Sequence, residues 1–207
     1  MNSVVIGLTG QTGAGKSTVS KIFSENGFVL IDADKISHEV VEIGKPCLAE
    51  LVDYFGNQIL NPDNSLNRKA LAKIVFTDKR KLESLNSICH PFITEEIFRL
   101  INQNALDGKN LILLDAPTLF ESKASDFCDI IISVTANSEL RCQRIMQRDN
   151  LTQESALERM NAQLEEDFFI QHSDFVIKNN SNLEQLSALA GEVAGKVKAY
   201  CQEKYLN

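Results

Sequence analysis

A glycine-rich segment near the N-terminus constrains the fold of this chain more than any other feature. Residues 10–17 read Gly-Gln-Thr-Gly-Ala-Gly-Lys-Ser, a complete G-x-x-x-x-G-K-S. They follow an apolar run at residues 4–8 and open a helical pattern, the strand–loop–helix context that a phosphate-binding loop requires. Glycines at positions 10, 13 and 15 let the backbone bend until its N–H groups converge on phosphate oxygens. A glycine-rich turn that binds no ligand is the alternative, and the complete motif in this context disfavours it.

The polar residues of this loop predict a nucleoside triphosphate and a metal ion. Lys16 would place its ammonium between the β- and γ-phosphates of ATP, and the Ser17 hydroxyl would ligate Mg²⁺. Residues 111–114 are apolar and lead into Asp115, a carboxylate that would orient water on the same ion. That second pattern is weak alone, because many buried strands end in a polar residue, and the loop upstream makes it credible. The predicted loop contacts of the nucleotide are Gly10, Thr12, Gly13, Ala14, Gly15, Lys16, Ser17 and Thr18.

Apolar runs recur along the chain with helical stretches between them. They are nearly continuous rather than alternating, as expected when helices cover both faces of a parallel sheet. The fold class is therefore α/β, a doubly wound parallel sheet of five strands. The predicted strands are residues 4–8, 28–31, 111–114, 130–134 and 175–177.

Two long interruptions of this pattern predict the domain organisation. Residues 32–110 look almost wholly helical, with a helix from Pro46 to Gly56 and N-caps at Asn67 and Asp78. This stretch is too long for a simple crossover, so residues 34–109 are a candidate helical substrate-binding domain. Residues 138–169 form a second, unusually polar helical excursion. The remaining segments, 1–33, 110–137 and 170–207, would form the nucleotide-binding core.

Charge and cysteine content exclude several classes of protein. The formal net charge is −7 and the isoelectric point is near 5.1, whereas nucleic-acid binding usually leaves a basic footprint. Five scattered cysteines without a Cys-x-x-Cys pair indicate free thiols in a reducing compartment. No apolar run approaches the ~20 residues that span a bilayer. We therefore expect a cytoplasmic protein with no nucleic-acid or membrane partner; the sequence leaves its oligomeric state open.

Two carboxylates follow the second predicted strand. Asp32 and Asp34 are two residues apart in Ile-Asp-Ala-Asp, so both side chains can lie on one side of the chain. Ligands of open α/β sheets bind at the carboxyl ends of the strands, where an Asp can accept the proton of an attacking hydroxyl. An N-cap for the following helix is an equally good interpretation of Asp34, and one residue can serve both roles.

Four arginines gather in the polar excursion. Arg141, Arg144 and Arg148 are spaced i, i+3, i+7, which predicts one helical face, and Arg159 follows in the next helix after a Thr152 N-cap. Charge runs are usually solvated faces. A phosphoryl group in transfer, however, needs guanidinium groups around it, and this favours a functional role.

In order and spacing these features resemble the dephospho-CoA kinase family over most of the chain. The resemblance implies a nucleotide-binding core in the strand order 2-3-1-4-5, a helical domain for the CoA substrate, and a lid at residues 138–169. It also implies a reaction in which ATP phosphorylates the ribose 3′-hydroxyl of dephospho-CoA, giving CoA and ADP in the last step of coenzyme A synthesis. The motifs that carry it are the loop with Lys16 and Ser17, Ile31 to Asp34, Leu66 to Leu71, His90-Pro91, Leu114 to Glu121, Arg144, Arg148, Arg159, Gln163, Asp174, Ile177 and Asn179.

Roles carry over from the family to matching positions. Asp34 matches the general base for the ribose hydroxyl, and Lys16 and Arg144 match phosphate-binding positions, so these three are the predicted catalytic residues. The resemblance places Arg148 and Arg159 in the lid, while Arg141 has no counterpart and is expected to be a solvated charge. Arg148 and Asn179 are assigned to the nucleotide, and Asp32, Arg68, His90, Pro117 and Arg159 to the acceptor.

Three positions depart from the family pattern. Gln11 stands where a second glycine is common, and Thr118 replaces a usual leucine. Phe169 occupies a place where the family often has a lysine, which puts any role of that lysine toward the nucleotide in doubt.

Other proteins with the same loop are the competing interpretations. A GTPase switch is disfavoured, because the Asp-x-x-Gly at Asp53 lies in a helical pattern and no Asn-Lys-x-Asp occurs. The main alternative is another small-molecule kinase, for a nucleoside, nucleotide or shikimate-like acceptor. The residues alone lead to a kinase of a small hydroxyl compound, and the identity of the acceptor depends on the family resemblance.

Overall fold

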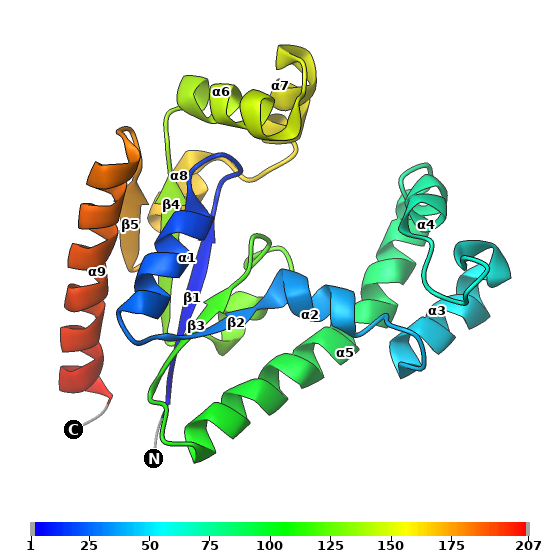
Figure 1. Cartoon of the computed structure of the whole chain (residues 1–207), viewed down its shortest axis with the longest axis horizontal. Coiled ribbons are helices and arrows are strands. Elements are labelled where there is room, and N and C mark those ends of the chain that lie inside the picture. The colour runs from blue at the N-terminus through cyan, green and yellow to red at the C-terminus, as the bar shows by residue number, and fades with distance from the viewer. Residues whose placement is uncertain (1–2, 206–207) are drawn as a thin grey trace. The chain divides into compact units, whose positions relative to one another are not determined.

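The computed structural model describes residues 3–205 and divides the chain into two compact units (Figure 1). The core unit comprises the residues up to Ile31 and those from Ile101 onward, and the helical unit is Asp32–Leu100. The functional roles and boundaries predicted for a substrate domain and a lid stay predictions.

The core unit contains a five-stranded sheet in the order β2-β3-β1-β4-β5, which confirms the expected order. Strand β1 pairs in parallel with β3 and β4, and β4 pairs in parallel with β5. Leu8 lies opposite Asp115 and Gly10 lies opposite Val134, so the phosphate loop starts beside the ends of β3 and β4. The strands are β1 Val4–Gly10, β2 Val29–Asp32, β3 Leu111–Asp115, β4 Ile130–Thr135 and β5 Phe175–Lys178.

Helices α1 and α9 pack beside one another against this sheet (Figure 1). Val19 and Phe23 of α1 share one buried cluster with Val193 and Val197 of α9 and with the apolar residues of β1 and β4. Burial of the strands under helices explains the uninterrupted apolar runs. The helices of the core unit are α1 Lys16–Glu25, η2 Ala124–Phe127, α6 Ser138–Asp149, α7 Gln153–Asn161, α8 Glu166–Gln171 and α9 Leu183–Lys204.

The helical unit confirms the helices expected there and decides which residue caps the helix after β2. Asn67 caps α4 by accepting the Ala70 N–H at 3.0 Å, as predicted. Asp32, not Asp34, caps α2 by accepting the Lys35 N–H at 3.0 Å, so Asp34 lies in the first turn. Pro91 lies inside α5. The elements are α2 Ala33–Glu39, α3 Pro46–Phe55, η1 Asn57–Ile59, α4 Arg68–Val75 and α5 Lys79–Leu106, of which the residues from Ile101 onward belong to the core unit.

Within residues 3–205, none of the helices is both long enough and apolar enough to cross a lipid bilayer.

Candidate active site around the phosphate loop

The phosphate loop connects β1 directly to α1, and its glycines are required by close backbone neighbours. Gly10 has a φ of +153°, and a Cβ there would lie 2.3 Å from the carbonyl oxygen of Val134 on the next strand. Gly13 has a φ of +78°, and a Cβ there would lie 2.8 Å from the carbonyl oxygen of Arg141. The loop therefore packs between β4 and the first turn of α6, and neither Gly10 nor Gly13 has space for a side chain.

Side chains from α6 and from the residue after β5 bind three consecutive carbonyl groups of the loop. Arg141 Nε donates to the Thr12 oxygen at 2.9 Å, and Arg144 Nη1 donates to the Gly13 oxygen at 3.3 Å. Asn179 Nδ2 donates to the Ala14 oxygen at 2.7 Å from a buried position. With these carbonyls held by donors, the first N–H groups of α1, which have no intrahelical partner, and the helix dipole favour an anion at the start of α1.

Lys16 forms an ion pair with Asp115, which joins the first helical turn of α1 to the end of β3. The two side chains are only 17% and 10% exposed, so water screens this pair weakly. In this structure, Lys16, which the sequence predicts to bind phosphate, pairs with Asp115, which the sequence predicts to lie beside the metal ion. Thr9 of β1 donates from its hydroxyl to the Pro117 oxygen at 3.1 Å, which fixes the chain just beyond β3.

The donors near Asp115 fit a magnesium ion that is held mainly by phosphates. Ser17, exposed in the first turn of α1, offers a hydroxyl, and Asp115 offers a carboxylate; both are the hard oxygen ligands that Mg²⁺ prefers. Among residues 3–205 no three His, Cys, Asp or Glu side chains form a metal-binding cluster. Magnesium in nucleotide sites usually takes one or two protein oxygens and completes its shell with phosphate and water, so this sparse set fits.

The structure contradicts the prediction that Arg141 is a solvated charge. Its side chain is buried, with 5% exposure, and it bonds the phosphate loop. Burial lowers the pKa of its guanidinium, an effect that the charge of Glu166 opposes. Arginine titrates so high that the group keeps its charge at neutral pH. The face predicted from the spacing exists for Arg141 and Arg144, but the prediction of which arginine faces water was wrong.

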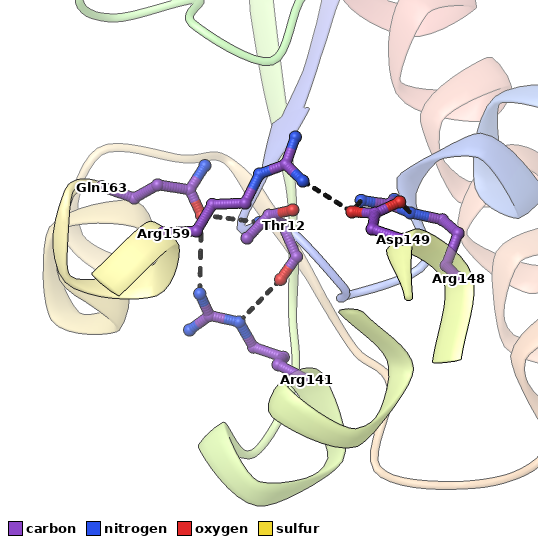
Figure 2. Close-up of polar contacts among 6 residues, drawn as sticks. All are labelled: Thr12, Arg141, Arg148, Asp149, Arg159 and Gln163. Atoms are coloured by element: carbon purple, nitrogen blue, oxygen red, sulfur yellow. Dashed lines mark hydrogen bonds and ion pairs between the residues drawn. The ribbon is translucent and has the colours of Figure 1, made fainter. Parts of the chain in front are cut away.

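Arg148 lies farther along α6, and in this structure it contacts a carboxylate rather than the loop (Figure 2). Asp149 accepts two hydrogen bonds from Arg148 at 2.8 Å and one from Arg159 at 2.6 Å. Hydrogen bonding by Arg148 lowers the pKa of Asp149, and the same bonds raise the pKa of Arg148. Two arginines with predicted ligand roles therefore share one carboxylate of the protein itself.

The predicted general base and two predicted acceptor-binding residues of the helical unit lie on its surface. Asp34 and Arg68 are exposed, and Arg68 Nη2 donates to the His38 oxygen at 3.4 Å. Arg68 borders a pocket of about 440 Å³ that His38 also lines. His90 is exposed, and burial raises the pKa of the residue before it, Cys89.

Gln163 and Asp149 both contact site residues, although the sequence predicts no role for either. Gln163 Oε1 accepts the Thr12 N–H at 2.7 Å, across 151 residues of sequence. Gln163 stands in the family pattern, and this was the one available signal. Phe169, in place of the family's lysine, is buried and contacts the Phe120 ring, with centroids 6.0 Å apart.

Known proteins resemble this chain along nearly its whole length. The family model for dephospho-CoA kinase matches residues 4–185. The dephospho-CoA kinase of Listeria monocytogenes is 44% identical over 180 residues, covering 87% of this chain and 90% of that protein. The dephospho-CoA kinase of Fusobacterium nucleatum is 40% identical over 202 residues, covering 98% and 99%. The solved dephospho-CoA kinase from Campylobacter jejuni has a TM-score of 0.72 at 28% identity, covering 93% and 96%.

A parallel sheet in this strand order, with a glycine-rich loop between β1 and α1 and arginines arranged around that loop, defines a P-loop kinase. The family model that matches residues 4–185 and the two relatives at 44% and 40% identity then identify the family within this class. This chain belongs to the dephospho-CoA kinase family.

Proposed function

We propose that this chain transfers the γ-phosphate of ATP to the ribose 3′-hydroxyl of dephospho-CoA, giving CoA and ADP. The observation that carries the proposal is the phosphate loop, with three carbonyls bound by Arg141, Arg144 and Asn179 and with Lys16 at its end. Membership of the family supports the choice of acceptor.

Lys16 and Arg144 would stabilise the charge that develops on the transferring phosphoryl group. Lys16 is held by Asp115, so phosphate binding would exchange one anionic partner of the lysine for another. Asp115 would then be available as an oxygen ligand on the metal side, together with Ser17. Mg²⁺, when bound, neutralises phosphate charge and screens the incoming hydroxyl from it.

Asp34 would act as the general base in the transfer. Its carboxylate would take the proton of the 3′-hydroxyl while that oxygen forms a bond to the γ-phosphorus. The bond between the γ-phosphorus and the oxygen that bridges it to the β-phosphorus breaks, and ADP leaves with that oxygen. Asp34 suits the role because it lies exposed in the first turn of α2, and the N-cap of that helix is Asp32.

The remaining assignments form part of the same proposal. Residues 34–109 would bind the acceptor through Arg68 and His90, and Asp32 and Pro117 would lie beside it. Residues 138–169 would cover the nucleotide, with Arg148 and Arg159 leaving Asp149 for ligand oxygens, and Asn179 would lie beside the nucleotide. The cytoplasm is the proposed location, since five free cysteines suit a reducing compartment.

The test is ADP release measured against a panel of acceptors. We expect release that depends on dephospho-CoA and produces CoA. The panel also holds adenosine, AMP, pantothenate and shikimate, which represent the other small-molecule kinases with this core. Equal or faster turnover with adenosine, AMP or shikimate would reject dephospho-CoA as the acceptor while leaving the chain a P-loop kinase.

A further inference from the structure

Two distant segments meet at a single residue of the phosphate loop, Thr12 (Figure 2). Arg141, in the first turn of α6, donates from Nε to the Thr12 oxygen at 2.9 Å. Gln163, two residues beyond the end of α7, accepts the Thr12 N–H at 2.7 Å. Arg141 Nη2 also donates to Gln163 Oε1, at 3.5 Å. These three hydrogen bonds close a ring, which we call the Thr12 clasp.

The clasp holds the α6–α7 hairpin, residues 138–163, near both of its ends. Within the hairpin, Cys142 and Ile145 of α6 pack against Ala156 and Met160 of α7 in a small buried cluster of their own. A hairpin with its own core tends to keep its internal shape, so fixing both ends sets the position of the whole piece. Arg148 and Arg159, which this hairpin carries, are then positioned relative to the loop.

Because Arg141 is buried, losing one hydrogen bond of the Thr12 clasp would cost free energy. Arg141 is only 5% exposed, so its donors cannot turn to bulk water if their acceptors are removed. The Thr12 oxygen and N–H are each satisfied by one member of the clasp. Without Arg141 or Gln163, the Thr12 oxygen or the Thr12 N–H would lose its hydrogen-bond partner. The loop backbone would then shift from the conformation that presents its N–H groups to phosphate.

We propose that Arg141 and Gln163 are positioning residues for nucleotide binding. They act through Thr12: the clasp fixes the backbone of the phosphate loop and the place of the α6–α7 hairpin before any nucleotide arrives. A preformed site binds its ligand more tightly, because less ordering remains to be done on binding. The inference concerns the nucleotide alone, so it stands whichever hydroxyl compound accepts the phosphate.

The test is the dissociation constant of ADP, measured by calorimetry on the full chain. Arg141→Met and Arg141→Gln both remove the charge, but only glutamine keeps a donor at the chain position of Nε. We expect Arg141→Met to weaken ADP binding about tenfold, which corresponds to about 1.4 kcal/mol. Arg141→Gln should stay within about threefold of the wild type, since it restores the bond to the Thr12 oxygen. Equal losses in the two variants would overturn the proposal, because loss of charge or of packing would then account for them.

Gln163→Met supplies a second, independent variant, because Gln163 is only partly buried and the chain should fold without its amide. It removes the acceptor of the Thr12 N–H, and we again expect about tenfold weaker ADP binding. The double variant, Arg141→Met with Gln163→Met, should bind ADP little more weakly than the worse single variant, since either change opens the same ring. Fully multiplied losses would show that the two residues act separately and would overturn the clasp.

The matched control is Gln147→Ala, an exposed glutamine of the same helix α6 as Arg141. It should leave the affinity for ADP and the melting temperature unchanged. In steady-state assays with a saturating acceptor, the clasp variants should raise the KM for ATP and change kcat less than threefold. A fall in kcat with KM preserved would instead place Arg141 among the groups that act in the transition state, against the proposal.

Discussion

Replacing Gly13 with alanine would place a methyl group against the backbone of α6. The new Cβ would lie 2.8 Å from the carbonyl oxygen and 3.1 Å from the Cα of Arg141. Both are main-chain atoms, so no change of side-chain rotamer can relieve the contact. Gly13 also has a φ of +78°, a left-handed conformation that costs an L-residue about 1–2 kcal/mol. Alanine at this position therefore carries two separate penalties.

Gly108 allows the two penalties to be separated. Its φ is +75°, close to that of Gly13, but a Cβ there would meet nothing within 4 Å. Gly108→Ala should therefore cost only the conformational ~1–2 kcal/mol. Gly13→Ala should cost a further ~1–3 kcal/mol for the contact with α6, as overpacking usually does. For a chain of this size each kcal/mol lowers the melting temperature by about 2–4 °C, so Gly13→Ala should melt about 2–12 °C below Gly108→Ala.

The assay is thermal unfolding of both variants and the wild type in one buffer, with ADP affinity measured alongside. Gly13→Ala should also bind ADP more weakly, whereas Gly108→Ala should bind it as the wild type does. If the two variants melt at the same temperature, α6 does not press on the loop at Gly13, and the reasoning about how the loop is held is refuted.

Three further substitutions test the other groups of the site. Lys16→Ala should lower kcat by ~10²–10³ and also lower the melting temperature, since it leaves Asp115 buried without its partner; adding Asp115→Asn should recover stability but not turnover. Asp34→Asn should lower kcat by ~10²–10⁴ with a nearly unchanged melting temperature, because Asp32 makes the capping bond; preserved kcat would leave Asp34 without a catalytic role. Asp149→Asn should lower the melting temperature at neutral pH but not in acid. The pKa of Asp149 is lowered in the folded state, so the stability that its carboxylate contributes is complete above the ordinary carboxyl pKa of about 4. That contribution is lost as the pH falls through the folded-state pKa. A stability difference between Asp149→Asn and the wild type that did not change between pH 7 and pH 3 would exclude this account.

The sheet and its loop could be predicted from sequence because their signals are local. Each of the five strands was predicted within two residues of its observed start and end, since an uninterrupted apolar run in an α/β chain indicates a strand that helices cover. The N-cap of the helix after β2 is Asp32, two residues before Asp34, for which the sequence left a cap and a catalytic role open. Asp32 and Asp34 both satisfy the local pattern of an N-cap, and the choice depends on where pairing in the sheet ends.

The contacts that hold the loop could not be predicted, because they join residues far apart in the sequence. Helical periodicity correctly placed Arg141 and Arg144 on one face, but it contains no information about what that face meets. The partner of Arg141 is the main chain of Thr12, 129 residues away, and a backbone carbonyl leaves no trace in the sequence. The usual expectation for a charge run, a solvated face, therefore failed for the arginine that is most buried.

The geometry of α6 explains why arginines with one spacing have different contacts. An α-helix rises 1.5 Å per residue, so Arg144 lies about 4.5 Å and Arg148 about 10.5 Å beyond Arg141 along the axis. Since the first turn of α6 already touches Gly13, the first two arginines reach loop carbonyls and the third extends past them. Arg148 is thereby left to pair with Asp149, a bond near the surface that a phosphate can replace more easily than the buried bonds of Arg141. Distance from the first turn of α6 thus separates the two arginines that bind the phosphate loop from the one that pairs with a carboxylate near the surface.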